Sequence, residues 1–541
     1  RSGARSWYAT KPTTTTTANA AATTTRQPRA RRISPTRSTA RALIRPIMPQ
    51  RTEAASPFRV TVKAWQGGST VPCCIPHMQV TSPALRGFAA RLDLDARLLP
   101  FAPHRWHGPH EVPTLHLDDV SGIPFLVDVS GVEEYQHRAR LRCGNDDLFA
   151  TVTEPTRGYE RYCREHLGLG APTHIRSAPP TNPLAVAAGC RHPDILAQLV
   201  DTARGAGGFQ VHPYMGIDDA WELAAAIATT ADVPVSVLAP PPPVTWVAND
   251  KALFAELVEL TLGPGWMPEG VTCRSPDDMA RHLKELCRRH HAVGLKRTRC
   301  ASAMGNKVFP SSTVRAATAE TLVADIASFL QRTQWPEGEE VVVVAWETAV
   351  CSPSTQLWIE PDAPPRLDGI YEQVLRGAEQ VFVGSRPSTL PAPVNRVLAD
   401  AATRVATALQ QLGYVGRCSF DHLVLGDPKE SFIVRFTECN GRWGGTSAPM
   451  HLVDRVVPGP RPPYRAQDIV YPQLVGVSFE KLVAELGDQL YDRRTGSGRY
   501  LLYNVGPLER FGKCGVLVLA DTQREADEAL RCDLPRRLGI D

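Results

Sequence analysis

The chain has 541 residues, too many for one compact core, and its length suggests three or four domains. With 43% hydrophobic and 21% charged residues it has an ordinary globular composition, and it contains no run of about 18 apolar residues that could span a membrane. The net charge of +4 is uneven, because residues 1–50 carry ten basic side chains and no acidic one, which leaves 50 basic and 56 acidic side chains in residues 51–541. The folded part is therefore mildly acidic and has no overall nucleic-acid signature.

We expect residues 1–52 to be a disordered basic tail, because this threonine-, alanine- and arginine-rich stretch has few large apolar side chains to offset chain entropy. Three interpretations stay open: a transit peptide, a nucleic-acid-binding tail, or a non-functional extension with Met48 as the true start. The thirteen cysteines are scattered and form no CxxC, which favours reduced thiols. We therefore expect a cytoplasmic protein, or one imported into an organelle if residues 1–47 are a transit peptide.

Residues 53–245 have the pattern of a first α/β domain, in which short apolar strands alternate with amphipathic helices. The expected strands are 123–129, 147–153 and 235–240, and the expected helices are 158–170, 192–208 and 218–235. Four prolines at 240–243 lack backbone donors and fix φ, so they predict a stiff boundary. No function is assigned to residues 53–146.

Residues 246–455 form a second α/β block that ends in an antiparallel hairpin. Helices are expected at 249–260, 275–291 and 395–413, and strands at 292–296, 339–347, 417–427 and 430–440. The last two strands flank GDPKE, a sequence typical of a hairpin turn. After a proline-rich linker, residues 456–541 predict a small α/β domain with helices at 478–491 and 522–534 and strands at 499–505 and 514–520.

The stretch TECNGRWGGT, residues 437–446, carries the most chemistry. Alternate side chains of a strand share a face, which would place Glu438, Asn440 and Arg442 together. Cys439 would face the other way and pack in the core. Carboxylate and amide oxygens suit Mg²⁺, and an arginine can hold a second anion through two parallel hydrogen bonds. Taken alone, the pattern is more typical of an exposed edge strand with ordinary polar residues.

A second carboxylate is expected across the hairpin. If the turn centres between Lys429 and Glu430, Asp421 lies opposite Glu438. The nearby His422 and His451 could assist the reaction, but a structural role is the favoured interpretation for both. Four further histidines lie in a proline- and tryptophan-bearing stretch that favours a loop over a metal site: His104, His107, His110 and His116.

Lys296 ends a predicted strand and precedes a loop of small and polar residues, 297–309, that includes Gly305 and Asn306. Such a loop can fold over phosphates and offer backbone N–H groups, with Lys296 and Lys251 as point charges. Each lysine alone is typical of a solvated surface. No GxxxxGK[ST] P-loop is present, and no GxGxxG follows a strand, so a nucleotide would be held in another way.

The order of these parts resembles the ATP-grasp superfamily over residues 246–455. Residues 147–245 and 478–534 resemble the pre-ATP-grasp and C-terminal domains of pheganomycin-type peptide ligases. The resemblance implies two α+β lobes with ATP between them, preceded by an α/β pre-ATP-grasp domain. One departure is that the loop holds only Gly305, with Ala303 where a glycine is usual.

The resemblance also implies roles for individual residues. The implied Mg²⁺ ligands are Asp421, Glu438 and Asn440, for two ions that Mn²⁺ could replace. The implied ATP contacts are Lys251, Lys296, Ser302, Gly305, Asn306, Trp346, Glu347 and Thr348. Arg442 and Lys296 are the implied catalytic residues, with Arg442 on the carboxylate or acyl phosphate.

The function implied is ADP-forming ligation of a carboxylate to an amine through an acyl phosphate, in specialised metabolism. The alternatives are an ATP-grasp carboxylase or amino-acid ligase of primary metabolism, and a non-catalytic nucleotide-binding protein. The expected partners are a small-molecule or peptide acid and an amine, without membrane or nucleic acid. A homo-oligomer is compatible with the sequence, and neither substrate can be named from it.

Overall fold

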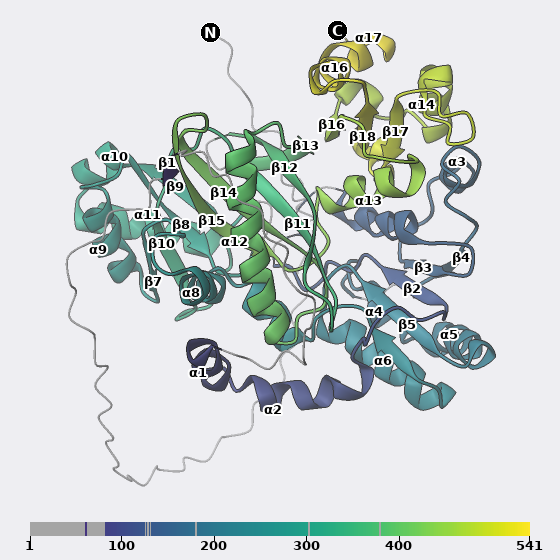
Figure 1. The fold of residues 1–541 in the computed structure, drawn as a ribbon, viewed down its shortest axis with the longest axis horizontal. Coiled ribbons are helices and arrows are strands. Elements are labelled where there is room, and N and C mark those ends of the chain that lie inside the picture. The colour runs from purple at the N-terminus through teal and green to yellow at the C-terminus, as the bar shows by residue number, and fades with distance from the viewer. Residues whose placement is uncertain are drawn as a thin grey trace, which may run out of the picture.

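The computed structural model describes Val60–Thr61 and residues 82–540, without 125, 127, 128, 130, 179, 180, 301, 302, 378 and 379. The predicted tail 1–52 lies outside the described residues. Three sheets and the helices that cover them form the described part, which confirms the predicted α/β class (Figure 1). No helix in the described ranges is long and apolar enough to cross a membrane.

The first sheet has five parallel strands in the order β4-β3-β2-β5-β6. Its strands are β2 (Thr114–Leu117), β3 (Leu148–Thr151), β4 (Thr173–Arg176), β5 (Phe209–Pro213) and β6 (Val235–Val237). Its helices are η3 (Val132–Arg142), α3 (Tyr159–Glu165), α4 (Val186–Cys190), α5 (Pro193–Ala206) and α6 (Asp218–Ala231). In Figure 1 this layer lies at the lower right, and the expected helices 158–170, 192–208 and 218–235 are α3, α5 and α6.

The strand predicted at 123–129 is wrong, because the described residues there form turns and a short 3₁₀ segment. The strand of this region is β2, which the sequence analysis assigned to a loop. An apolar run of this length cannot be distinguished from buried irregular chain by periodicity, and Pro124 lacks the N–H that a ladder needs. In β2 the buried His116 interrupts the apolar pattern.

The prolines at 240–243 are buried, and the run begins a helix, α7 (Pro242–Asn249). Proline is accepted in the first turn, where its missing N–H would have no intrahelical partner. Helix α8 (Lys251–Leu262) follows at once, and the Asp250 side chain caps it by accepting from the backbone N–H groups of Ala252 and Leu253. The helix predicted at 249–260 therefore begins two residues later than expected, at Lys251.

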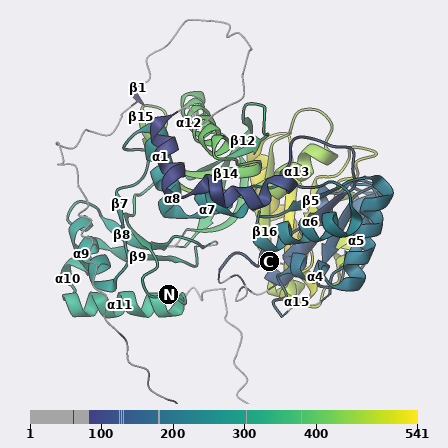
Figure 2. The same ribbon diagram turned by 90° about the horizontal axis from the view of Figure 1, so that it is seen from below.

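The second sheet has four antiparallel strands in the order β7-β10-β8-β9. Its strands are β7 (Gly270–Cys273), β8 (Ala292–Arg297), β9 (Asn306–Pro310) and β10 (Val341–Ala345). Helices α9 (Pro276–Leu286), α10 (Ser311–Ala316) and α11 (Ala319–Arg332) complete this lobe, which lies apart on the left of Figure 1 and on the lower left of Figure 2. Apolar residues of α9, α11, β8 and β10 form one core.

The third sheet has nine strands in the order β1-β15-β14-β11-β12-β13-β16-β18-β17. The strands are β1 (Val60–Thr61), β11 (Pro353–Ile359), β12 (Arg366–Arg376), β13 (Val381–Pro387), β14 (Gly416–Asp427), β15 (Ser431–Asn440), β16 (Tyr464–Val470), β17 (Tyr500–Tyr503) and β18 (Lys513–Leu519). Helix α12 (Ala392–Gln411) lies across one face in Figure 1 and shares a core with α8. Because β16 pairs with β13, the predicted boundary at residue 456 falls between elements of one sheet.

The remaining elements are shorter and lie mainly toward the two ends of the described chain. They are α1 (Pro83–Arg91), α2 (Leu94–Leu98), η1 (Leu99–His104), α13 (Ser447–Val456), η4 (Pro472–Leu474), α14 (Phe479–Leu486), η5 (Gly487–Gln489), α15 (Leu508–Phe511), α16 (Gln523–Glu528), η6 (Ala529–Asp533) and α17 (Leu534–Arg537). The C-terminal helices and β16–β18 share a core with α3 and α13, so the end of the chain packs on the first sheet's layer.

Candidate functional site

The hairpin β14–β15 presents the predicted charged side chains. Asp421 pairs with Glu438, as predicted, but the ladder shifts by one residue between Asp421 and His422, so that Thr437 is an extra residue in β15. This bulge lets Phe436 and Cys439 both face the core, although they are three residues apart. Glu438 consequently lies on the opposite face, and the predicted packing of Cys439 in the core is confirmed.

A chain of hydrogen bonds orders the polar face of the hairpin. Asn440 donates from Nδ2 to Asp421 Oδ2 at 3.0 Å, and its Oδ1 accepts from an Nη of Arg442 at 2.8 Å. The other Nη of Arg442 donates to the Tyr214 hydroxyl, 2.9 Å away, and to the Trp443 carbonyl at 2.8 Å. Tyr214 directly follows β5 of the first sheet, so this network joins two sheets.

Lys251 reaches the same face from the first residue of α8. Its Nζ lies 3.1 Å from Glu438 Oε2 and 3.2 Å from the carbonyl oxygen of Cys300, and the residue is only 6% exposed. Burial opposes its charge, but Cys300 and Glu438 beside it hold the pKa of Lys251 above its ordinary value. A buried ammonium is thus placed beside one of the two paired carboxylates.

The two carboxylates titrate in opposite directions. Burial, with the charge of Glu438 beside it, raises the pKa of Asp421 to about 7. Burial also acts to raise the pKa of Glu438, but the charges of Lys251 and Lys296 outweigh it, and the pKa lies below its usual range. Burial lowers the pKa of Lys296, and the neighbouring Lys251 lowers it further. These shifts describe a site where like charges crowd together in a poorly hydrated place.

The loop between β8 and β9 closes over Lys251. The backbone N–H of Lys251 donates to the Thr298 carbonyl at 3.0 Å, and Arg299 Nε donates to Asp250 Oδ2 at 2.9 Å. Ala303 has a φ of +59°, a conformation that favours glycine, at the position where the family would have one. Ser302 lies outside the described residues.

Gly305 and Asn306 end this loop. A Cβ on Gly305 would lie 2.3 Å from Cys300 Sγ, so the close approach of the two loop ends requires glycine there. The buried Oδ1 of Asn306 has no hydrogen-bond partner among the described residues. This orphaned acceptor is the kind of group that a ligand would satisfy.

The predicted purine-binding residues follow β10. Trp346 stacks with Lys296, whose Nζ lies 5.2 Å from the ring centre, and Glu347 pairs with Arg435 at 3.5 Å. Thr348 is exposed. These three are not among the residues that line the cleft around Glu438, so the structure leaves their role in holding a base as a prediction.

The cleft has a volume of about 340 Å³ when the open solvent at its mouth is included, and it brings together predicted and unpredicted residues. Four predicted residues line it: Lys251, Glu438, Asn440 and Arg442. Seven others line it that sequence reasoning missed: Ile123, Pro124, Met215, Trp246, Asn249, Arg299 and Cys300. Asn249 exchanges hydrogen bonds with both backbone groups of Gly441, where a Cβ would approach Asn249 to 2.7 Å. The close Asn249–Gly441 contact is a long-range feature that no local pattern indicates.

The oxygens of Asp421, Glu438 and Asn440 suit a hard cation. Mg²⁺ in nucleotide sites takes one or two carboxylates and completes its shell with phosphate oxygens and water. The pair Asp421–Glu438 meets this need, and a cation beside it would favour the ionised form of Asp421, whose pKa is raised to about 7 by burial and by the charge of Glu438. No cluster of three or more His, Cys, Asp or Glu placed for metal binding occurs among the described residues, so His104, His107, His110 and His116 form no such site there.

The two histidines near the site differ. His422 is 1% exposed, lies 3.1 Å from the Thr355 hydroxyl, and has its pKa lowered to about 3 by burial, which fits the favoured structural role. His451 packs edge to face against Trp443, with ring centres 5.2 Å apart, and lines a different pocket.

Comparisons with known proteins support the resemblance for one segment of the chain. Residues 136–229 match the family model of the Pre ATP-grasp domain. A comparison with curated protein sequences found no match. Solved structures with a similar course of the chain include N5-carboxyaminoimidazole ribonucleotide synthetase with ADP (11% identity, TM-score 0.48, covering 81% of this chain and 99% of that one).

A carboxyaminoimidazole ribonucleotide synthase from Aspergillus clavatus with ATP is 13% identical, with a TM-score of 0.46, covering 81% of this chain and all of that one. The biotin carboxylase domain of 2-oxoglutarate carboxylase from Hydrogenobacter thermophilus is 12% identical, with a TM-score of 0.47, covering 78% and 89%. At TM-scores below 0.5 these likenesses establish no function or site. Residues 136–229 are thus similar to a Pre ATP-grasp domain, which agrees with the resemblance to such a domain that the sequence shows over residues 147–245.

Proposed function

We propose that the protein is an ATP-dependent, ADP-forming ligase that joins a carboxylate to an amine, and that it acts in specialised metabolism. The observation that carries the proposal is the hairpin face on which Asp421 and Glu438 lie opposite each other, with the Lys251 ammonium 3.1 Å from Glu438. Paired carboxylates beside buried lysines suit a metal–phosphate complex, in which both charge types find partners.

In this proposal, Asp421, Glu438 and Asn440 would hold the divalent ion, which when bound would neutralise charge on the transferring phosphoryl group. Lys251 and Lys296 would contact phosphate oxygens, and the loop before Gly305 and Asn306 would cover them. Each of these side chains now makes protein contacts, so binding exchanges the Lys251–Glu438 pair for contacts with the nucleotide.

Arg442 would orient the acid. Its contacts with Asn440 and Tyr214 hold the guanidinium beside the metal ligands, where a carboxylate can approach the γ-phosphate. Attack of that carboxylate gives an acyl phosphate and ADP, and the amine then displaces phosphate. The protein's part is positioning and charge neutralisation, and exclusion of water by the loop protects the acyl phosphate.

The test is a screen of acid and amine pairs with Mg-ATP, read by ADP release and by the mass of the product. Release that needs both an acid and an amine, with formation of an amide, supports the proposal. Release that needs bicarbonate instead indicates a carboxylase. ATP binding without ADP release from any pair would identify a non-catalytic nucleotide-binding protein and refute the ligase.

A further inference from the structure

A second pocket lies at the point where the parallel sheet reverses its strand order. The chain runs from β2 outward through β3 and β4, then returns to the other side of β2 to form β5 and β6. In such sheets, ligands bind outside the carboxyl ends of the two strands that flank the reversal. The residues that follow these strands, Asp118 after β2 and Tyr214 after β5, both line the pocket.

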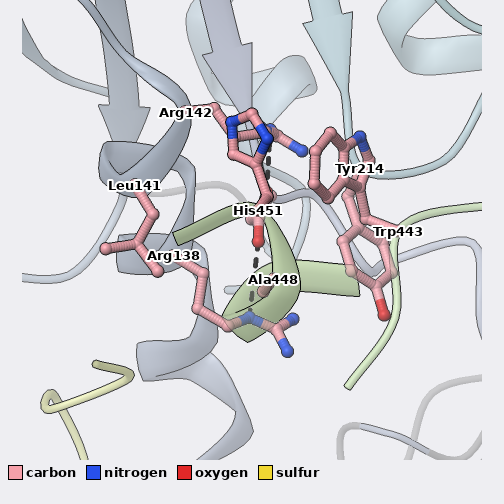
Figure 3. Close-up of a pocket in the computed structure, with 8 residues that line it drawn as sticks. Arg138, Leu141, Arg142, Tyr214, Trp443, Ala448 and His451 are labelled. Carbon is pink, nitrogen blue, oxygen red and sulfur yellow. Dashed lines mark ion pairs between the residues drawn. The ribbon is translucent and has the colours of Figure 1, made fainter. Parts of the chain in front are cut away.

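We call this the switch-point pocket; the space between its lining residues is about 260 Å³ when the open solvent at its mouth is included. Figure 3 shows that η3 brings Arg138 and Arg142 to it, while Trp443 and His451 close it from the side of the third sheet. Tyr214 directly precedes Met215, and Trp443 directly follows Arg442, and both Met215 and Arg442 line the cleft around Glu438. The same two chain segments therefore line both spaces.

The two arginines of the pocket, Arg138 and Arg142, make different contacts. Arg142 lies 2.8 Å from Asp118 and also donates to the carbonyls of Leu117 and His212 at the strand ends. It therefore fixes Asp118 and the sheet edge. Arg138 uses only its Nε, which lies 3.3 Å from Asp118 and donates to the Tyr135 carbonyl.

The Nη atoms of Arg138 make no hydrogen bond to any residue that the structure describes, although Arg138 is only 9% exposed. Its guanidinium stacks on two rings, with its carbon 4.5 Å from the centre of Tyr135 and 5.1 Å from that of Tyr214. A buried guanidinium whose two Nη atoms have no protein acceptor can donate two parallel hydrogen bonds to an anion.

The charge balance also favours an anion. One carboxylate, Asp118, faces the two guanidinium groups in the pocket. His451 adds no charge of either sign, since burial lowers its pKa well below the usual range and keeps the ring neutral. Beyond Tyr135, Asp468 and Lys513 lie 3.8 Å apart and offset each other. The pocket therefore keeps a net positive charge.

We propose that Arg138 binds a second anionic group on the acid substrate and so determines which acids the enzyme accepts. This inference rests on the proposed function, in which Arg442 holds the reacting carboxylate. The guanidinium carbon of Arg442 lies 5.5 Å from the Tyr214 ring centre, and that of Arg138 lies 5.1 Å from it, so the two are at most 10.6 Å apart. That span equals about three extended residues at most, which suits a dicarboxylic acid or a short peptide with an acidic end.

The test measures binding of matched acids to the full-length protein by tryptophan fluorescence and calorimetry. The pairs differ only in the second anion: succinate and succinamate, glutarate and glutaramate, and O-phosphoserine and serine. We expect at least one dianion to bind about tenfold or more tightly than its neutral-tailed partner. Preference confined to O-phosphoserine would identify a phosphate, and preference for the diacids a carboxylate.

Arg138→Met keeps a long side chain that can pack on the two rings but removes the charge. The affinities of this variant for the two acids of each pair should therefore differ by less than twofold. Arg138→Lys should keep part of the preference. Arg164→Met, an exposed arginine on α3, is the control and should change nothing. Affinity for Mg-ATP should stay unchanged in all three variants, which a merely structural role for Arg138 does not predict.

The inference is overturned if no dianion is preferred by the natural protein, or if Arg138→Met retains the preference. These results are distinct from failure of the ligase proposal. Absence of ADP release with every acid and amine pair refutes the ligase but leaves selective anion binding standing. Acid-dependent ADP release without a preference for dianions refutes only the role of Arg138.

Discussion

Glu438→Gln should reverse the site's preference between Mg-ATP and metal-free ATP. The substitution keeps the size of the side chain and removes one charge from a position that is 33% exposed and 3.1 Å from Lys251 Nζ. At an effective dielectric constant of ~20, two unit charges at that separation attract by about 5 kcal/mol. With roughly half of this lost to solvent, one charge at this position is worth about 2–3 kcal/mol, or a factor of about 100 in affinity.

The affinity for Mg-ATP should therefore fall about 100-fold, because the cation loses one of two carboxylates. The affinity for ATP in EDTA should rise, since Lys251 no longer has Glu438 as a partner and its charge is free for phosphate. Both are measured by calorimetric titration with and without Mg²⁺. Glu430→Gln, at the exposed turn of the same hairpin, is the matched control and should bind both forms as the natural protein does.

An affinity for Mg-ATP within threefold of the natural value would refute the metal assignment. A fall of equal size with and without Mg²⁺ would show instead that the substitution damages the cleft as a whole. Release of ADP, if the ligase proposal holds, should drop by at least the factor found for Mg-ATP binding.

Three further outcomes follow from the contacts described above. Gly305→Ala should weaken ATP binding about tenfold, because its Cβ would lie 2.3 Å from Cys300 Sγ, and Cys300→Ala should partly restore it in titrations of the double variant. Lys296→Met should abolish most ADP release. Its melting temperature, measured by calorimetry, should equal or exceed that of the natural protein, because burial lowers the pKa of this lysine and disfavours its charge. A clear fall in melting temperature would contradict this prediction. Burial lowers the pKa of His116 from 6.5 to about 4, so the unfolded chain takes up a proton that the folded state excludes, and the free energy of unfolding should decline by up to about 3 kcal/mol as pH falls from 6.5 toward 4. The melting temperature of His116→Gln should therefore depend less on pH over that range than that of the natural protein. An equal pH dependence in both proteins would contradict this prediction.

Local chemistry made the hairpin predictable. Alternating apolar residues on both strands and a turn of Gly, Asp and Pro set its ends, and counting from the turn placed Asp421 opposite Glu438. Counting from the turn did not predict the bulge at Thr437. The buried apolar residues of β15 fall at even positions, Phe432, Val434 and Phe436, and then at an odd one, Cys439. This change in the alternation is a signal of the bulge that the sequence contains.

Other features depend on contacts between distant segments. Tyr214 meets Arg442 across 228 residues, and Asn249 meets Gly441 across 192, so neither contact leaves a local pattern. The strand β2 was missed because a buried histidine interrupts it, and a run with Pro124 was chosen in its place. Domain bounds, Ser302 and the purine contacts stay predictions.

The division of the strands among three sheets determines which part of the molecule is free to swing. Among the described strands, β7 to β10 pair only with one another, whereas the sheet that holds Asp421 and Glu438 continues without a break to β17 near the end of the chain. A rotation of residues 270–345 could thus admit a nucleotide without rupturing a single interstrand bond, and Gly263 and Gly265, both with positive φ, lie where the chain enters that lobe. The C-terminal strands β16 to β18, by contrast, belong to the same sheet as the hairpin and must move with it as one rigid body.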